Sequence, residues 1–146
     1  METMKAGMWK NLGAWLFIGF GGVISLASLP ATSAPTVFLA DVVLWPIDGG
    51  QALSAESRLL SAILGGVMLG FGTTLLVLVA KVYPRDPQLV RTVILAGVWV
   101  WFITDSLASI AAAAPLNALF NVGFLLAFLV PWRTVPANAQ LTVSGS

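Results

Sequence analysis

The chain has 146 residues, of which 58% are hydrophobic and 9% are charged, whereas a soluble domain has about 25% charged residues. Its formal net charge of +1 excludes the strongly basic surface that nucleic acid requires, so we expect no nucleic-acid partner. The absence of Cys and His excludes disulfides, thiolate metal sites, His-ligated haem, the commonest zinc sites and a Ser-His-Asp triad. We therefore expect no metal or cofactor, and the composition disfavours an enzyme.

Four apolar stretches dominate the sequence, and Asp105 is the one charged residue that they contain. Each is close to the roughly 20 residues that a helix needs to cross a bilayer, where the backbone must satisfy its own hydrogen bonds. The sequence therefore predicts a single all-α domain, an integral membrane four-helix bundle. Its helices are expected at about residues 12–29, 57–80, 88–112 and 115–132, followed by a flexible tail over 134–146.

The first stretch also has features of a cleavable signal peptide. Lys5 and Lys10 precede it, and small residues follow it at 31–34. The hydrophobic region of a signal peptide usually has about 7–15 residues, and this stretch is longer. We expect a retained helix.

The connection over 30–57 is long for a loop between helices and is itself half apolar. Pro35 and Pro46 bracket residues 36–45, which are too few to cross a membrane, and Trp45 suits the headgroup region. We expect a short helix or an extended segment there. Three roles stay open for it: an interfacial helix on the outer face, a lid over the bundle, or a docking surface.

Small residues recur every four positions along the second helix. Such a stripe lets two helix backbones approach closely inside a membrane. We expect it to pack against the first helix, which has small residues of its own, rather than to form a dimer interface. The stripe consists of Ala62, Gly66, Gly70 and Thr74.

The basic residues divide unequally between the two sides of the predicted spans. Only Arg58 lies on one side, and by the positive-inside rule the other side is cytoplasmic. We therefore expect both termini in the cytoplasm. The residues of that side are Lys5, Lys10, Lys81, Arg85, Arg91 and Arg133.

The third and fourth helices are separated only by residues 112–115, so they must form a hairpin. This places Asp105 and Asn121 at similar depths, and a carboxylate inside a membrane needs a partner. Asn117 lies one turn from Asn121, and Arg58 begins the second helix on the same side. We expect these four residues to form an intramembrane polar cluster. A structural clamp is favoured over a proton- or solute-binding site.

The aromatic side chains are expected to anchor the protein at the membrane interface or to face lipid, rather than to line a pigment pocket. No predicted span contains Lys, so a retinal Schiff base has no attachment point. The aromatic residues considered are Trp9, Trp15, Trp99, Trp101, Phe102 and Trp132.

Residues 56–132 resemble small bacterial inner-membrane proteins that are loosely related to the DoxX family. The resemblance depends on Arg58 before Gly65–Gly66, the basic turn near Arg85, Asp105 and Pro115. Where such proteins often have an acid in the fourth helix, this chain has Asn121. The resemblance implies a bacterial plasma-membrane location and an accessory role beside a larger enzyme.

The leading functional hypothesis is an accessory or scaffold protein. It would pack within the bilayer among membrane lipids, alone, as a homo-oligomer or in a larger membrane complex. The alternative is a small transporter or proton-coupled carrier that uses Asp105. A third hypothesis is a lipid- or quinone-acting enzyme that uses Asp41, Asp48 and Glu56 at the outer face.

Overall fold

The computed structural model describes residues 9–133, and within this range the chain is all-helical, as predicted, with no strand. The predicted tail over 134–146 lies outside the described residues. A single turn of 3-10 helix, η1, follows the first helix at Pro30–Thr32. The α-helices are α2 (Leu12–Leu26), α3 (Ala34–Leu44), α4 (Ala55–Lys81), α5 (Pro87–Ala111) and α6 (Pro115–Leu129).

Residues at the helix ends account for these bounds. The Asp86 carboxylate accepts a hydrogen bond from the Leu89 N–H (2.9 Å), and Pro87 occupies the first turn of α5. Pro115 opens α6 in the same way. The first helix ends at Leu26, short of the predicted residue 29, because its last hydrogen bonds tighten to the 3-10 type ahead of Pro30.

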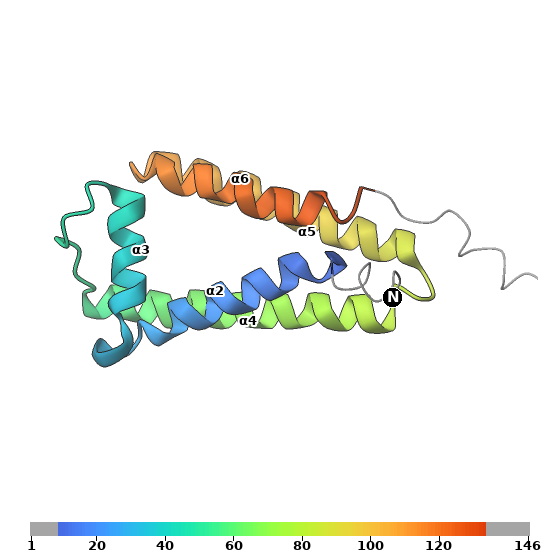
Figure 1. Ribbon diagram of the computed structural model, residues 1–146, viewed down its shortest axis with the longest axis horizontal. Coiled ribbons are helices and arrows are strands. Elements are labelled where there is room, and N and C mark those ends of the chain that lie inside the picture. Colours follow the sequence, from blue (N-terminus) through green and yellow to red (C-terminus); the bar gives the residue numbers. More distant parts are fainter. Residues whose placement is uncertain (1–8, 134–146) are drawn as a thin grey trace, which may run out of the picture.

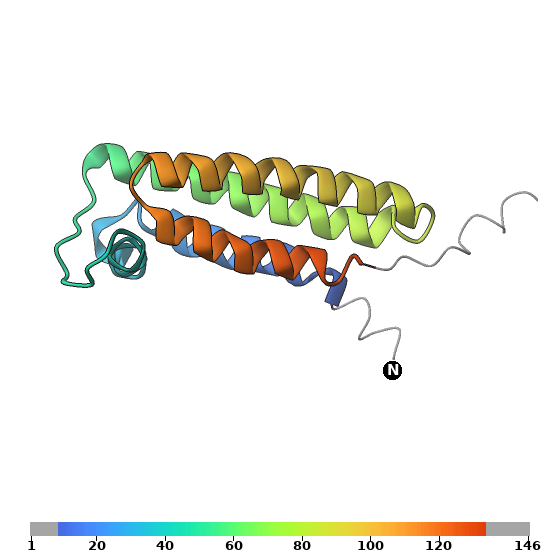
Figure 2. The ribbon, with the colours of Figure 1, turned by 90° about the horizontal axis from the view of Figure 1, so that it is seen from above.

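The helices α2, α4, α5 and α6 run lengthwise and alternate in direction, and α3 crosses one end of them (Figure 1). Viewed from above, α3 is seen almost end-on, which confirms that it lies crosswise (Figure 2). The most extensive contacts join α2 to α4 and α5 to α6, whereas α4 and α5 touch sparsely. The molecule therefore consists of two helix pairs bridged at one end by α3.

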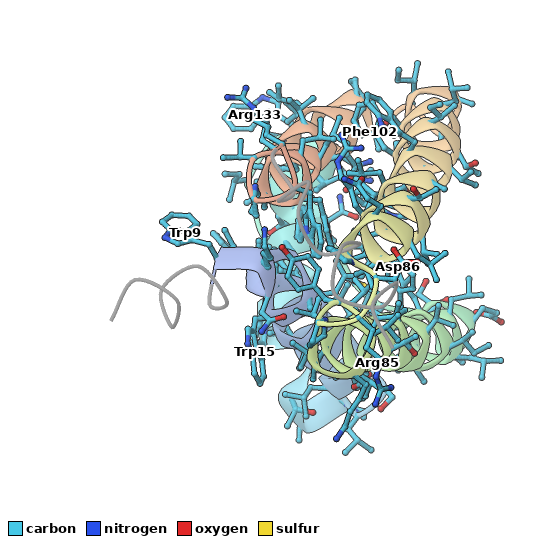
Figure 3. The ribbon with its side chains drawn as sticks, turned by 90° about the vertical axis from the view of Figure 1, so that its right-hand side faces the viewer. Trp9, Trp15, Arg85, Asp86, Phe102 and Arg133 are labelled. Carbon is cyan, nitrogen blue, oxygen red and sulfur yellow. The ribbon has the colours of Figure 1, made fainter. Side chains whose placement is uncertain are left out.

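The two pairs meet in an apolar core at the end opposite α3, which we call the closed end. Lys10 Nζ lies over the rings of Tyr83 and Trp132 there, and Arg91 Nε donates to the Trp132 carbonyl (2.9 Å). Seen from this end, Arg85 and Arg133 project outward, as do Trp9 and Trp15 on one side (Figure 3). The core residues are Ala14, Phe17, Leu75, Val90, Ile94, Val98, Leu125, Phe128 and Trp132.

Two of the expected surface aromatics lie elsewhere. Trp132 is not a lipid-facing anchor, since it is only 1% exposed and packs edge-on against Tyr83. Trp101 is partly buried and packs against Phe17. By contrast, Trp9 and Trp15 are more than half exposed.

The close contact between α2 and α4 depends on Gly65 and Gly72. A Cβ at Gly65 would lie 2.6 Å from the Gly21 carbonyl, and one at Gly72 would lie 2.8 Å from the Ala14 carbonyl. Gly66 and Gly70 have no atom of the described chain within 4 Å of such a Cβ. The prediction that the stripe packs against the first helix is therefore wrong for Gly66 and Gly70, which lie on another face of α4. Neighbouring residues such as Gly65 and Gly66 face different directions because each step along a helix turns the side chain by about 100°.

Of the helices in residues 9–133, α4 and α5 are long and apolar enough to cross a membrane by length and composition. Only 17% of the most apolar window of each is buried inside the protein. Three further apolar helices, α2, α3 and α6, are shorter.

Candidate functional site

An open cavity of about 1160 Å³ lies between the two helix pairs on the side of α3. Within residues 9–133, α2, α3, α4, α5 and α6 all contribute to its walls, which are mainly aliphatic and aromatic. Ligand sites in proteins are typically apolar hollows of about 300–1,000 Å³ with a few convergent polar groups. This cavity has that composition, with its polar side chains supplied chiefly by α5 and α6.

The polar wall is built across the α5–α6 hairpin. Asn121 Nδ2 donates to Asp105 Oδ2 (2.9 Å) and to Ser106 Oγ (3.2 Å). One turn nearer the hairpin end, Asn117 Nδ2 donates to Ser109 Oγ (2.8 Å). Asn121 is 4% exposed, and Asp105 is half-buried. Of the four residues of the predicted cluster, the structure thus joins Asp105 to Asn121, while Asn117 lines the same cavity and bonds to Ser109.

The turn between α5 and α6 sets the register of this wall. The Ala114 N–H donates to the Ser109 carbonyl and the Ala113 N–H to the Ile110 carbonyl, which together form a Schellman motif. Ala113 adopts the left-handed conformation that the motif requires, with φ of 59°. The chain then reverses within a few residues, so Asp105 and Asn121 face each other.

Arg58 does not join this cluster. Its Nη1 donates instead to the carbonyl of Ala27, the residue that caps the C-terminus of α2 (3.3 Å). A cation is favourable at this position because the C-terminal carbonyls carry partial negative charge. The basic residue on the predicted outer side therefore stabilises a helix end.

Aromatic rings form the floor of the cavity beside the polar wall. Trp101 precedes Asp105 by one turn of α5, and Phe124 follows Asn121 by about one turn of α6. Phe17 packs against both, with ring centroids at 5.3 Å and 6.0 Å. Phe20 packs edge-on against Phe124 at 4.8 Å. The carboxylate therefore lies about one helical turn from a cluster of ring faces and edges.

The crossing helix α3 closes one end of the cavity. Thr36 Oγ1 donates to the Val23 carbonyl of α2 (3.1 Å), which ties the start of α3 to that helix. Asp41 is 4% exposed and accepts hydrogen bonds from the N–H groups of Gly49 (3.1 Å) and Gln51 (3.2 Å). Its carboxylate thus holds the loop that returns to α4.

Two of the loop acids accept hydrogen bonds from the backbone of the loop. Asp41 is occupied by the loop backbone, and Asp48 accepts from the Gly50 N–H (2.9 Å). In the described part of the chain, no group of three or more His, Cys, Asp or Glu side chains could hold a metal ion.

Sequence reasoning missed the cavity and its aromatic floor. Trp101 and Phe124 are one turn from the two central polar residues, and this spacing is visible in the sequence. This spacing places Trp101 on the same face of α5 as Asp105, and Phe124 on the same face of α6 as Asn121. It does not predict the cavity in front of those faces. That space depends on how far apart the two helix pairs lie.

Comparison of the chain with protein-family models gave no match, and neither the curated proteins nor the solved structures gave one.

Proposed function

We propose that this chain is a multi-pass protein of a bacterial plasma membrane, in which α2, α4, α5 and α6 form a membrane-spanning bundle. Apolar surface supports this proposal. The helices α4 and α5 leave most of their apolar windows unburied, and in water such a surface would drive association. The shorter α2 and α6 lie alongside them and also expose large apolar side chains, among them Leu26 and Leu126.

The charge distribution supports an orientation with both termini in the cytoplasm. Lys10, Lys81, Arg85, Arg91 and Arg133 gather at the closed end, whereas Arg58 is at the end near α3. The positive-inside rule then places the closed end in the cytoplasm and α3 outside. A reporter enzyme fused after Arg133 is expected to report the cytoplasm, and one inserted near Asp48 the outside. A periplasmic carboxyl terminus would overturn this orientation.

Within that membrane, we propose that the protein binds a small amphipathic molecule, as a carrier or binding protein. The single observation that carries this proposal is the cavity, whose apolar walls converge on the Asp105–Asn121 pair. A structural clamp needs the hydrogen bond between these two residues, but it does not need an open space in front of them. An open apolar hollow with a few convergent polar groups has the composition of a ligand site.

Two open glycines provide a matched test. Gly123 lines the cavity and Gly66 does not, yet neither would bring a Cβ within 4 Å of another group. Gly123→Leu is expected to fill part of the cavity without disturbing the fold. Native mass spectrometry should detect one dodecanol bound to the wild-type protein and to Gly66→Leu, but much less bound to Gly123→Leu. Equal binding by both variants would overturn the cavity as a binding site.

An accessory or scaffold role is the second candidate, and the outward face of α4 favours it. Gly66 and Gly70 leave that face open to a helix from a second copy or a larger complex. The same Gly66→Leu variant addresses this role, because it should dissociate an oligomer that uses the face. An unchanged oligomeric state would argue against a homo-oligomer of that kind. The DoxX-like relationship remains a prediction.

A further inference from the structure

We infer that the cavity takes a lipophilic cation: a molecule with one positive charge on a bulky apolar body, whose charge is recognised by Asp105 and by the aromatic floor. This inference rests on the proposed binding function and specifies the charge of the ligand. Three observations support it, namely the unneutralised carboxylate, the aromatic rings in the same cavity and the sparse contact between α4 and α5.

The first observation is that no basic side chain of the described chain neutralises Asp105. Its Oδ2 accepts a hydrogen bond from the uncharged Asn121, while Arg58 is held by the Ala27 carbonyl. Lys10 and Arg91 are bound to backbone carbonyls at the closed end. A carboxylate without a cationic partner is costly in an apolar setting when it is ionised, so a cationic ligand would supply the missing charge partner and an anion would be repelled.

The second oxygen of Asp105 is free to meet such a ligand. No hydrogen bond within residues 9–133 occupies Asp105 Oδ1. In this part of the chain, Asn11 Oδ1 is the one fully buried side-chain polar atom without a hydrogen-bond partner. Because Asp105 Oδ1 also has no partner but is not such an atom, it is accessible. Asp105 lines the cavity, and its carboxylate has one oxygen without a hydrogen bond from the described residues.

The second observation is the aromatic floor. Trp101, Phe124 and Phe20 line the same cavity as Asp105 and remain partly exposed. A cation within about 6 Å of a ring centroid is attracted by the negative face of the ring, and the attraction is stronger where water is excluded. A cation held by Asp105 would lie beside these rings, which also accommodate an apolar body.

The third observation is an opening that suits a ligand already dissolved in lipid. The helices α4 and α5 touch sparsely. Cavity-lining side chains on either side of this gap are largely exposed, at 62% for Val67 and 68% for Val100. An apolar cation that partitions into the bilayer can reach Asp105 through this gap without crossing the polar surface.

Tetraphenylphosphonium and tetraphenylborate test the inference because they share size and shape but carry opposite charges. The full chain, purified in an uncharged maltoside detergent, is dialysed to equilibrium against each labelled ion. We expect the phosphonium to bind and the borate not to bind. Asp105→Asn should weaken phosphonium binding by at least about tenfold, since it removes the charge but keeps an acceptor for Asn121.

Two controls separate charge recognition from folding. Glu56→Gln removes a fully exposed acid outside the cavity and should leave phosphonium binding unchanged. Asp105→Glu keeps the charge and should retain binding even if Asp105→Asn melts at a lower temperature.

The outcomes distinguish this inference from the proposed function. If borate binds as well as phosphonium, or if Asp105→Asn binds phosphonium normally, the cationic ligand is excluded while the cavity remains a binding site for dodecanol. If neither dodecanol nor phosphonium binds to the wild-type protein, the proposed binding function itself fails.

Discussion

The same four helices pack tightly at the closed end and leave an open cavity at the end near α3, and the separation of the two helix pairs makes the difference. At the closed end, Val90, Ile94 and Phe128 are at most 2% exposed and fill the space between the helix pairs. Near α3, several residues that face the cavity are small or polar, including Gly123 and Asn117. The other walls there are mainly aliphatic and aromatic, so the space is left because the two helix pairs lie apart, and α3 bridges the separated pairs.

This comparison indicates that the two ends of one small domain differ in what they contribute. The closed end carries the apolar contacts that fix the helices, so the other end is free to contain an acid and an open space. Residues at a binding site are commonly less well packed than the core that supports them. Stability and binding should therefore respond to substitutions at different ends.

The largest expected change in stability comes from a comparison of two phenylalanines on α6. Phe128 is 1% exposed and its ring fills the space above Gly13, whereas Phe120 is 48% exposed and lines the cavity. Phe128→Ala should lower the free energy of unfolding by about 3–5 kcal/mol, the usual cost of emptying a buried aromatic site. Phe120→Ala should cost less than about 1 kcal/mol, because little packing is lost there.

Thermal and denaturant unfolding in detergent would measure both variants. Similar losses of stability for the two substitutions would contradict the division between a packed end and an open end. A large loss for Phe120→Ala alone would reverse it.

A smaller effect on stability is expected from substitutions at two adjacent glycines of α4, one on its packed face and one on its open face. Gly65→Ala would place a methyl group against the backbone of α2, close to the Gly21 carbonyl. The two helices would have to separate, at a cost of about 1–3 kcal/mol. Gly66→Ala meets no neighbour and should be neutral or stabilising by up to about 1 kcal/mol, because Ala favours a helix more than Gly does.

Melting temperatures of this pair in the same detergent would provide the measurement. Destabilisation by Gly66→Ala, with little change for Gly65→Ala, would mean that the sequence-predicted stripe is the packed face after all. Loss of dodecanol binding in Gly65→Ala would further show that the α2–α4 contact also shapes the cavity.

Several features of the fold followed from local sequence. Asp86 and Pro87 fix the start of α5, and Pro115 fixes the start of α6, because capping and proline geometry act over a few residues. The short hairpin between them required Asp105 and Asn121 to lie at similar depths, and the structure joins them by a hydrogen bond.

Other predictions depended on distances between helices and were therefore beyond the sequence. Gly65 and Gly66 are neighbours, and the sequence gives no reason to prefer either one for a close helix contact. Only the rotation of α4 against α2 selects Gly65. Arg58 was placed with Asp105 by its charge and by its position on the same side, but the carbonyl of Ala27 takes its hydrogen bond.

The sequence by itself determined the all-helical architecture, the helix starts and the pairing across the α5–α6 hairpin, because each depends on composition or on residues close together in the chain. The tertiary structure alone decided which glycine face packs, that Trp132 is buried, and that an apolar cavity opens beside Asp105. These features depend on how helices distant in sequence approach one another, and side-chain volume on several helices together sets that approach.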